Sequence, residues 1–143
     1  MSELTDYTDL CHFFRSRVRD HLQESVLISN RFCKEDEKEP LEFVIRGISE
    51  AENAELKEAS RRPGANGVIH FDQKAYCDRL IIAATVYPNF KNLELQRSWG
   101  ALNAEELLGK MLLAGEYAKL LAAVKHLSGF DETIGSLKDT IKK

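Results

Sequence analysis

The sequence has few of the residues that cross-link a chain or bind metals and phosphates. Its three cysteines, Cys11, Cys33 and Cys77, are widely spaced and include no CxxC pair. An odd number at such spacings makes neither a disulfide framework nor a zinc site, so we expect reduced thiols and no metal. Glycine-rich loops of the GxGxxG or Walker A type are absent as well, and we therefore expect no nucleotide cofactor.

The chain also lacks a large excess of positive or negative charge, and it has no long apolar run. The formal net charge is -3 at pH 7, which gives no reason to expect a nucleic-acid partner. The longest apolar run, Leu80 to Val86, is far shorter than the ~20 residues that span a bilayer. The N-terminus also lacks the charged and apolar regions of a signal peptide. We predict a cytoplasmic protein without membrane contact.

What is present suits one folded domain. The chain has 143 residues, of which 43% are hydrophobic and 30% charged, and this size fits a single domain over 1–143. Within it we expect an N-terminal helix and a β-hairpin over 1–48. A helical part should follow over 49–143.

The N-terminal part carries two periodicities. Apolar residues recur every four positions over 9–22, which predicts an amphipathic helix. They are Leu10, Phe14, Val18 and Leu22. The segments 25–32 and 41–48 carry β-favouring or alternating apolar residues and predict strands. Because the link 34–40 is charged up to its proline, an antiparallel hairpin is the economical pairing.

Capping residues mark the helices that follow. Ser49 and Glu52 form a capping-box pattern, so a helix should begin there and end near 61–62, before Pro63. We expect a mobile loop near 61–71. Asp72 can cap the next helix, in which 80–86 reads either as helix, which we favour, or as a buried strand.

Capping residues also predict where the last helices begin. Asn92 and Asn103 can cap helices over 93–99 and 103–112, and the glycine at 115 should break the chain before a helix over 116–127. A final segment, 131–143, begins at a second capping aspartate. The predicted fold is α+β and predominantly helical, with an N-terminal antiparallel β-hairpin packed on a multi-helix C-terminal half.

Two groups of residues are candidates for function. His70, Asp72 and Cys77 are close enough in sequence to suggest a Cys–His nucleophile, but a buried cysteine near a capping aspartate explains them better, and we expect no enzyme. The second group is aromatic and consists of Tyr87, Phe90, Trp99 and Tyr117. Such side chains form partner-binding hot spots or close a core over a loop, and both readings stay open.

An ordered series of short motifs runs over most of the chain. It includes Val86-Tyr-Pro-Asn89, Trp99-Gly100, Ala104-Glu-Glu-Leu-Leu108, Gly115-Glu-Tyr-Ala118 and Ser128-Gly-Phe-Asp131. In this order and spacing the chain resembles the XkdN-like tail assembly chaperones of phages and prophages. Ala114 and Ser128 stand where the family often has proline and asparagine.

The resemblance implies a protein that binds the phage tape-measure protein during tail assembly and is absent from the finished particle. It carries over no active site and no cofactor. The alternative is a structural tail component, such as a tube or neck subunit. The sequence alone does not set the oligomeric state.

Overall fold

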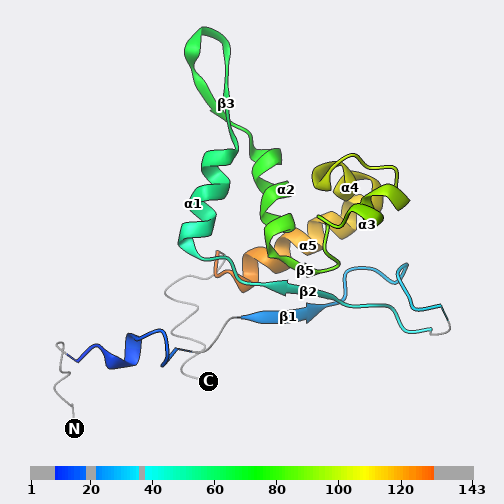
Figure 1. Cartoon of the computed structure of the whole chain (residues 1–143), viewed down its shortest axis with the longest axis horizontal. Coiled ribbons are helices and arrows are strands. Elements are labelled where there is room, and N and C mark those ends of the chain that lie inside the picture. Colours follow the sequence, from blue (N-terminus) through cyan, green and yellow to red (C-terminus); the bar gives the residue numbers. More distant parts are fainter. Residues whose placement is uncertain (1–8, 19–21, 36–37, 131–143) are drawn as a thin grey trace.

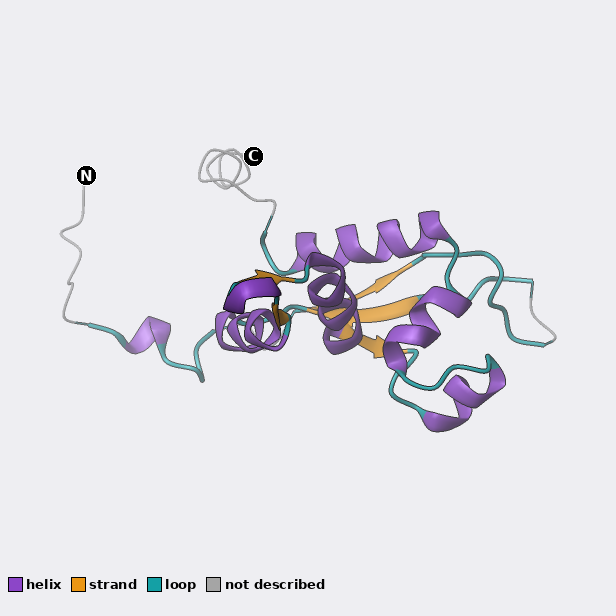
Figure 2. Cartoon of the chain, turned by 90° about the horizontal axis from the view of Figure 1, so that it is seen from above, coloured by secondary structure: helices purple, strands orange, loops and turns teal. Residues whose placement is uncertain are grey.

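The computed structural model describes residues 9–18, 22–35 and 38–130. Within them, strands β1 (Gln23–Val26), β2 (Phe43–Arg46) and β5 (Thr85–Tyr87) form an antiparallel sheet in the order β1-β2-β5. Helices α1 (Glu50–Ala59) and α2 (Gln73–Ala84) stand upright on this sheet. They are therefore seen almost end-on in Figure 2. The mixed α+β class and the N-terminal hairpin packed on helices are confirmed.

The β1–β2 hairpin follows the predicted alternation. Gln23 pairs with Arg46 and Val26 with Phe43. Phe43 and Ile45 are buried on the face that carries the helices, because successive strand residues point to opposite faces. Strand β2 lies within the predicted segment 41–48. Strand β1 starts before the predicted segment 25–32 and ends at Val26, so the prediction of a strand over 27–32 is wrong.

Strand β5 resolves the two readings of the apolar run at 80–86. The run is helical as far as Ala84, and Thr85 then turns into a strand that pairs with Ile45. The Thr85 hydroxyl donates to the Ile81 carbonyl at 2.7 Å. Helix and strand are thus both right for part of the segment, and the third strand of the sheet was not predicted.

The predicted helix starts are confirmed where a side chain caps them. The Ser49 hydroxyl accepts from the Glu52 N–H at 3.2 Å, and Asp72 accepts from the Ala75 N–H at 3.0 Å. Helices α3 (Leu93–Ser98) and α4 (Ala104–Met111) begin after Asn92 and Asn103. Each cap satisfies an N–H that has no partner inside its helix.

Helix α5 (Ala114–Leu127) begins two residues earlier than predicted. The glycine at 115 lies in its first turn, so the predicted break there is wrong. The chain turns instead at Leu113, whose N–H donates to the Glu116 carboxylate at 2.8 Å. A first-turn carboxylate also complements the helix dipole, which explains why a helix starts here without a Ser or Asn cap.

The core lies between the sheet and helices α2, α4 and α5. Its fully buried members are Ile45, Leu80, Ile81, Ala84, Phe90, Leu107, Leu120 and Val124. Residues from both halves of the chain share this cluster. The hairpin is therefore held by helices that follow it in sequence, as a two-stranded hairpin requires.

The helix predicted over 9–22 is wrong for the residues that are described. Only a 3-10 turn, η1 (Cys11–Phe13), forms there. The four members of the apolar stripe are all exposed. A short helix in water depends on packing its apolar face, and no described element covers this one. Residues 19–21 lie outside the described part of the chain, as does the predicted final segment 131–143.

The segment expected as a loop near 61–71 is a second hairpin. Strands β3 (Arg61–Pro63) and β4 (Ile69–Phe71) pair antiparallel around the 3-10 turn η2 (Ala65–Gly67). The hairpin projects from the ends of α1 and α2 that lie away from the sheet (Figure 1). We call residues 61–71 the arm. Its predicted mobility stays a prediction.

Candidate protein-interaction surface

The four aromatic residues selected from the sequence do not form one patch. Phe90 is 0% exposed, and its ring lies 6.4 Å from that of Phe43. Its side chain fills the core, so of the two readings left open for this group, closing the core holds for Phe90 and its place among the partner-binding candidates is wrong. Trp99 is half-buried at the C-terminal end of α3.

Tyr117 is held inside the α2–α5 contact. Its hydroxyl donates to the Asp78 carboxylate at 2.6 Å, and the Lys74 ammonium lies 4.7 Å from its ring centre. Burial, and then the hydrogen bond to Asp78, raises the pKa of Tyr117. The side chain therefore ties two helices together.

Tyr87 is the exposed member of the set and lies at the rim of an apolar cavity. It belongs to β5, is 50% exposed, and shares a cavity of about 130 Å³ with Phe32, Leu41, Phe43, Pro88 and Met111. An engineered apolar cavity of about 150 Å³ in another protein holds benzene. The space at Tyr87 therefore suits one apolar side chain.

The other cavity residues were not selected from the sequence as binding residues. They come from the β1–β2 connection, from β2, from the residue after β5 and from the last turn of α4. Sequence order gives no signal that such segments meet. The two cavity residues of the β1–β2 connection are bonded to each other, because the Leu41 N–H donates to the Phe32 carbonyl at 2.6 Å.

A larger groove of about 430 Å³ opens beside the start of α5. Its lining consists of Leu27, Ile28, Ser29, Asn30, Leu113, Gly115, Glu116 and Lys119. Arg31 fixes its wall, because this guanidinium binds both Glu116 carboxylate oxygens and the Met111 carbonyl. The hydrogen bond from Arg31 lowers the pKa of Glu116 to about 2. The groove wall is thus polar, unlike the cavity at Tyr87.

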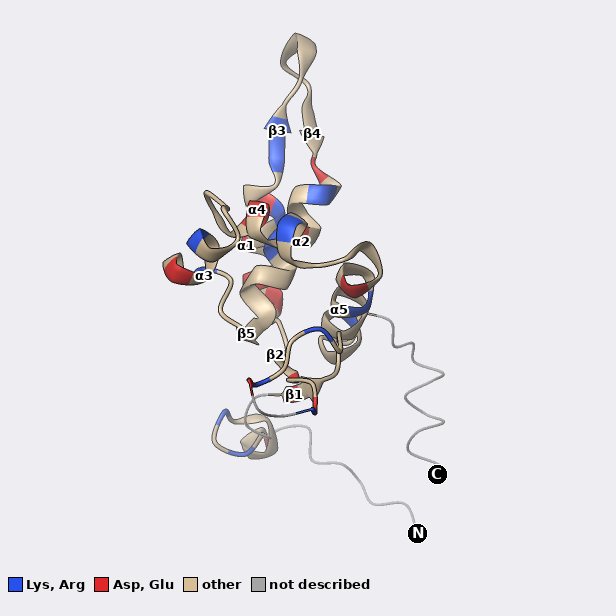
Figure 3. Cartoon of the chain, turned by 90° about the vertical axis from the view of Figure 1, so that its right-hand side faces the viewer, with Lys and Arg blue, Asp and Glu red and all other residues tan. Residues whose placement is uncertain are grey.

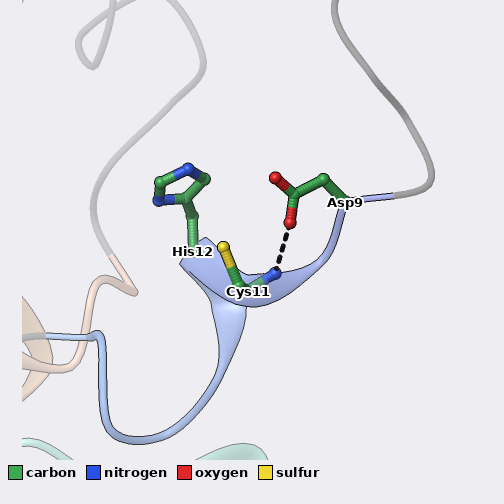
Figure 4. Close-up of side chains that lie close together, drawn as sticks. All are labelled: Asp9, Cys11 and His12. Atoms are coloured by element: carbon green, nitrogen blue, oxygen red, sulfur yellow. Dashed lines mark hydrogen bonds between the residues drawn. The ribbon is translucent and has the colours of Figure 1, made fainter.

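Three side chains with metal-binding atoms gather on η1. The donor atoms of Asp9, Cys11 and His12 lie within 4.8 Å of one another, on an exposed turn (Figure 4). The Asp9 carboxylate accepts from the Cys11 N–H at 3.1 Å and raises the pKa of the Cys11 thiol. Exposed acidic groups are common without a bound ion, and in this structure the Asp9 carboxylate holds the backbone of the turn through the Cys11 N–H.

The residues of the suggested Cys–His pair have separate surroundings. Cys77 is buried in α2, where the Gln73 amide donates to its sulfur at 3.6 Å. His70 is exposed on β4, and Asp72 caps α2. This arrangement agrees with the reading of a buried cysteine near a capping aspartate.

Among the described residues, none of the helices has the length and apolar character needed to span a bilayer. The accessible features include an apolar cavity, a groove and a projecting arm. Surfaces of this kind serve protein recognition, in which a few apolar anchors in pockets supply most of the binding energy. These features are therefore the candidates for a protein-interaction surface.

Comparison with known proteins identifies the class more closely. The model of the phage XkdN-like tail assembly chaperone family matches residues 10–142. The match covers nearly the whole chain, and the protein therefore belongs to this family.

Two relatives come from Bacillus subtilis strain 168. The uncharacterized protein YqbN is 28% identical over 142 residues, which is 94% of this chain and 93% of the relative. The phage-like element PBSX protein XkdN is 26% identical over 143 residues, with the same shares of both chains. The crystal structure of YqbN has a TM-score of 0.75 at 27% identity and covers 86% of this chain and 98% of its own.

Proposed function

We propose that this tail assembly chaperone acts in the bacterial cytoplasm by binding the tape-measure protein, and that an apolar side chain of that protein enters the cavity at Tyr87. The observation that supports the proposal is the apolar cavity of about 130 Å³, whose rim residue is half-exposed. No bond is made or broken in this function, and we expect no enzymatic activity.

The tape-measure protein needs a cover before the tail tube surrounds it. A long helical protein exposes apolar stripes at that stage, and exposed apolar surface drives aggregation. A chaperone with a preformed apolar cavity covers one anchor residue without having to rearrange. Binding to a preformed site avoids the entropy cost of ordering a flexible one.

The direct experiment is co-purification. The tagged chain is expressed together with the tape-measure protein of its own tail gene cluster, and the two are expected to elute together. Tyr87→Ala should weaken the complex at least tenfold, about 1.4 kcal/mol, because it removes the rim of the cavity.

Phe13→Ala is the matched control. Phe13 is also an exposed aromatic residue, but it lies on η1 and does not line the cavity. It should leave the affinity unchanged. Equal loss in both variants would contradict the cavity as the anchor site. Recovery of the chain in fixed amounts from purified tails would instead identify it as a tube or neck subunit.

A further inference from the structure

A further pocket is formed by residues of α1, α2, the end of α5 and the chain just after it. Its volume is about 370 Å³. Its lining consists of Asn53, Lys57, Tyr76, Lys125 and Phe130. None of these residues lines the cavity at Tyr87 or the groove beside the start of α5. The pocket is therefore a separate site, to which the proposed function gives no role.

Two buried polar side chains form the innermost part of this pocket. Asn53 on α1 is 5% exposed, and Tyr76 on α2 is 6% exposed. The Tyr76 hydroxyl donates to the side-chain oxygen of Asn53. Burial raises the pKa of Tyr76, so the hydroxyl keeps its proton. This bond therefore determines which way the Asn53 amide is turned.

The amide nitrogen of Asn53 has an unused hydrogen-bond position. With its oxygen bound to Tyr76, this nitrogen donates to no acceptor in residues 9–18, 22–35 and 38–130. Every fully buried side-chain nitrogen or oxygen of those residues does have a partner, so the Asn53 nitrogen must reach the surface of the pocket. A donor that is almost buried and opens on a pocket suits a ligand that accepts a hydrogen bond.

The charge of the pocket lining is positive. Acidic and basic residues are interspersed along the helices (Figure 3), but the lining holds Lys57 and Lys125 and no acidic residue. Neither lysine has an ion-pair partner within the described part of the chain. Glu50 lies near enough to Tyr76 to raise its pKa, but one carboxylate does not neutralise two ammonium groups. The pocket therefore suits an anionic ligand.

The other lining residues favour a carboxylate on a polypeptide. Phosphates are typically held by arginine forks or by the backbone N–H groups of a helix start, and the lining offers neither. The rings of Tyr76 and Phe130 instead supply apolar surface beside the lysines. Because Phe130 is 46% exposed, the pocket is open on that side, whereas sites for small molecules bury most of the ligand. A glutamate with an apolar neighbour in the same chain fits better than a free small acid.

We propose that this pocket binds a glutamate side chain of a partner polypeptide. The Asn53 amide donates to the carboxylate, Lys57 and Lys125 supply the opposite charge, and an apolar residue beside the glutamate packs on Phe130. The partner is thus an acidic stretch that also contains apolar residues. Since the lining is separate from the cavity at Tyr87, the chain can hold two polypeptide segments at the same time.

Nuclear magnetic resonance on the full chain reads this site directly. The probe is the peptide acetyl-Leu-Glu-Leu-amide, and the signal is that of the Asn53 side-chain amide. The signal should move until it saturates, because a charge-assisted hydrogen bond forms. Three matched probes should bind at least tenfold more weakly: the peptide acetyl-Leu-Gln-Leu-amide, acetate and inorganic phosphate.

Substitutions separate the pocket from a general effect of charge. Lys57→Gln and Lys125→Gln should each weaken peptide binding at least threefold, because each removes a positive charge from the pocket. Lys91→Gln is the matched control, since Lys91 is exposed and does not line the pocket, and it should keep the wild-type affinity. Asn53→Asp keeps an oxygen for the tyrosine hydroxyl but replaces the amide donor by a carboxylate. It should abolish binding, followed through the backbone N–H of Phe130, and the lysine variants decide if circular dichroism shows it to be unfolded.

The inference is overturned if the Asn53 signal does not move, if the glutamine peptide, acetate or phosphate binds as tightly as the glutamate peptide, or if Lys91→Gln loses as much affinity as Lys57→Gln. Movement only in a chain with both Asp131→Asn and Glu132→Gln would also overturn it, because the chain's own acidic residues would then compete for the pocket. Binding of the tape-measure protein is tested separately with Tyr87→Ala, so either proposal can fail while the other stands.

Discussion

Helix α2 and the arm that leads into it differ sharply in burial. Seven of the 12 residues of α2 are buried, whereas no residue of β3, η2 or β4 is. Both segments carry large apolar side chains, so composition does not explain the difference. What differs is whether another element covers them. Buried apolar residues stabilise the fold, while uncovered ones are available to a partner.

The largest expected effect tests the buried side of this comparison. Leu120 lies on α5, belongs to the core and is 0% exposed. Leu120→Ala should lower the free energy of unfolding by ~2–5 kcal/mol, because it removes buried methylene groups and leaves a cavity. Urea denaturation measures this change. Lys119→Ala, at the neighbouring exposed position, should stay within ~0.5 kcal/mol, and equal losses would mean that the core has been placed wrongly.

A smaller effect should come from the Arg31–Glu116 pair at the edge of the core. Because Arg31 lowers the pKa of Glu116 to about 2 from 4.5, the folded state holds this proton less tightly than the unfolded state does. The pair therefore contributes its full stability above about pH 5, and that contribution is lost as the pH falls toward 2.

The Glu116→Gln variant isolates this contribution. It keeps an oxygen that can accept the Leu113 N–H but removes the charge. Thermal unfolding followed between pH 6 and pH 2.5 should show a smaller loss of stability for Glu116→Gln than for the wild type. Parallel curves for the two proteins would show that Glu116 does not titrate as its surroundings require.

Local signals in the sequence were sufficient for most helices. Ser49, Asp72, Asn92 and Asn103 each cap the helix that was predicted after them, because capping is a contact between neighbours in sequence. The alternation in β2 likewise predicted which face is buried. The family was also recognisable from the order of its motifs.

The features that were missed depend on distant contacts. Strand β5 is only three residues long and exists because it pairs with β2. The stripe over 9–22 had the right period, but a helix there would have no described surface to pack against. The arm did have a signal, since Asn66-Gly67 just before the β-favouring Val68 and Ile69 indicates a hairpin turn, and the structure places both residues at positive φ.

The candidate site was the hardest part to predict. Tyr87 and Phe90 are three positions apart and equally aromatic, yet one lies on a cavity rim and the other fills the core. Tyr87 ends β5, whereas Phe90 follows that strand and packs beside Phe43, and the order of residues does not show such contacts. Ile69 gave no signal at all, because an exposed apolar residue has meaning only once its surroundings are known.

The smallest expected effect tests the exposed side of the comparison. At low protein concentration, Ile69→Ala should change the free energy of unfolding by no more than ~0.5 kcal/mol, since the side chain is largely in water before as well as after folding. The measurement is the same urea denaturation used for Leu120→Ala, so one type of truncation is compared at a buried and an exposed position.

Both variants are compared with the wild type at the same low protein concentration, so that only folding within one chain is measured. A loss as large as that of Leu120→Ala would mean that Ile69 is covered within its own chain, and the contrast between the arm and α2 would disappear.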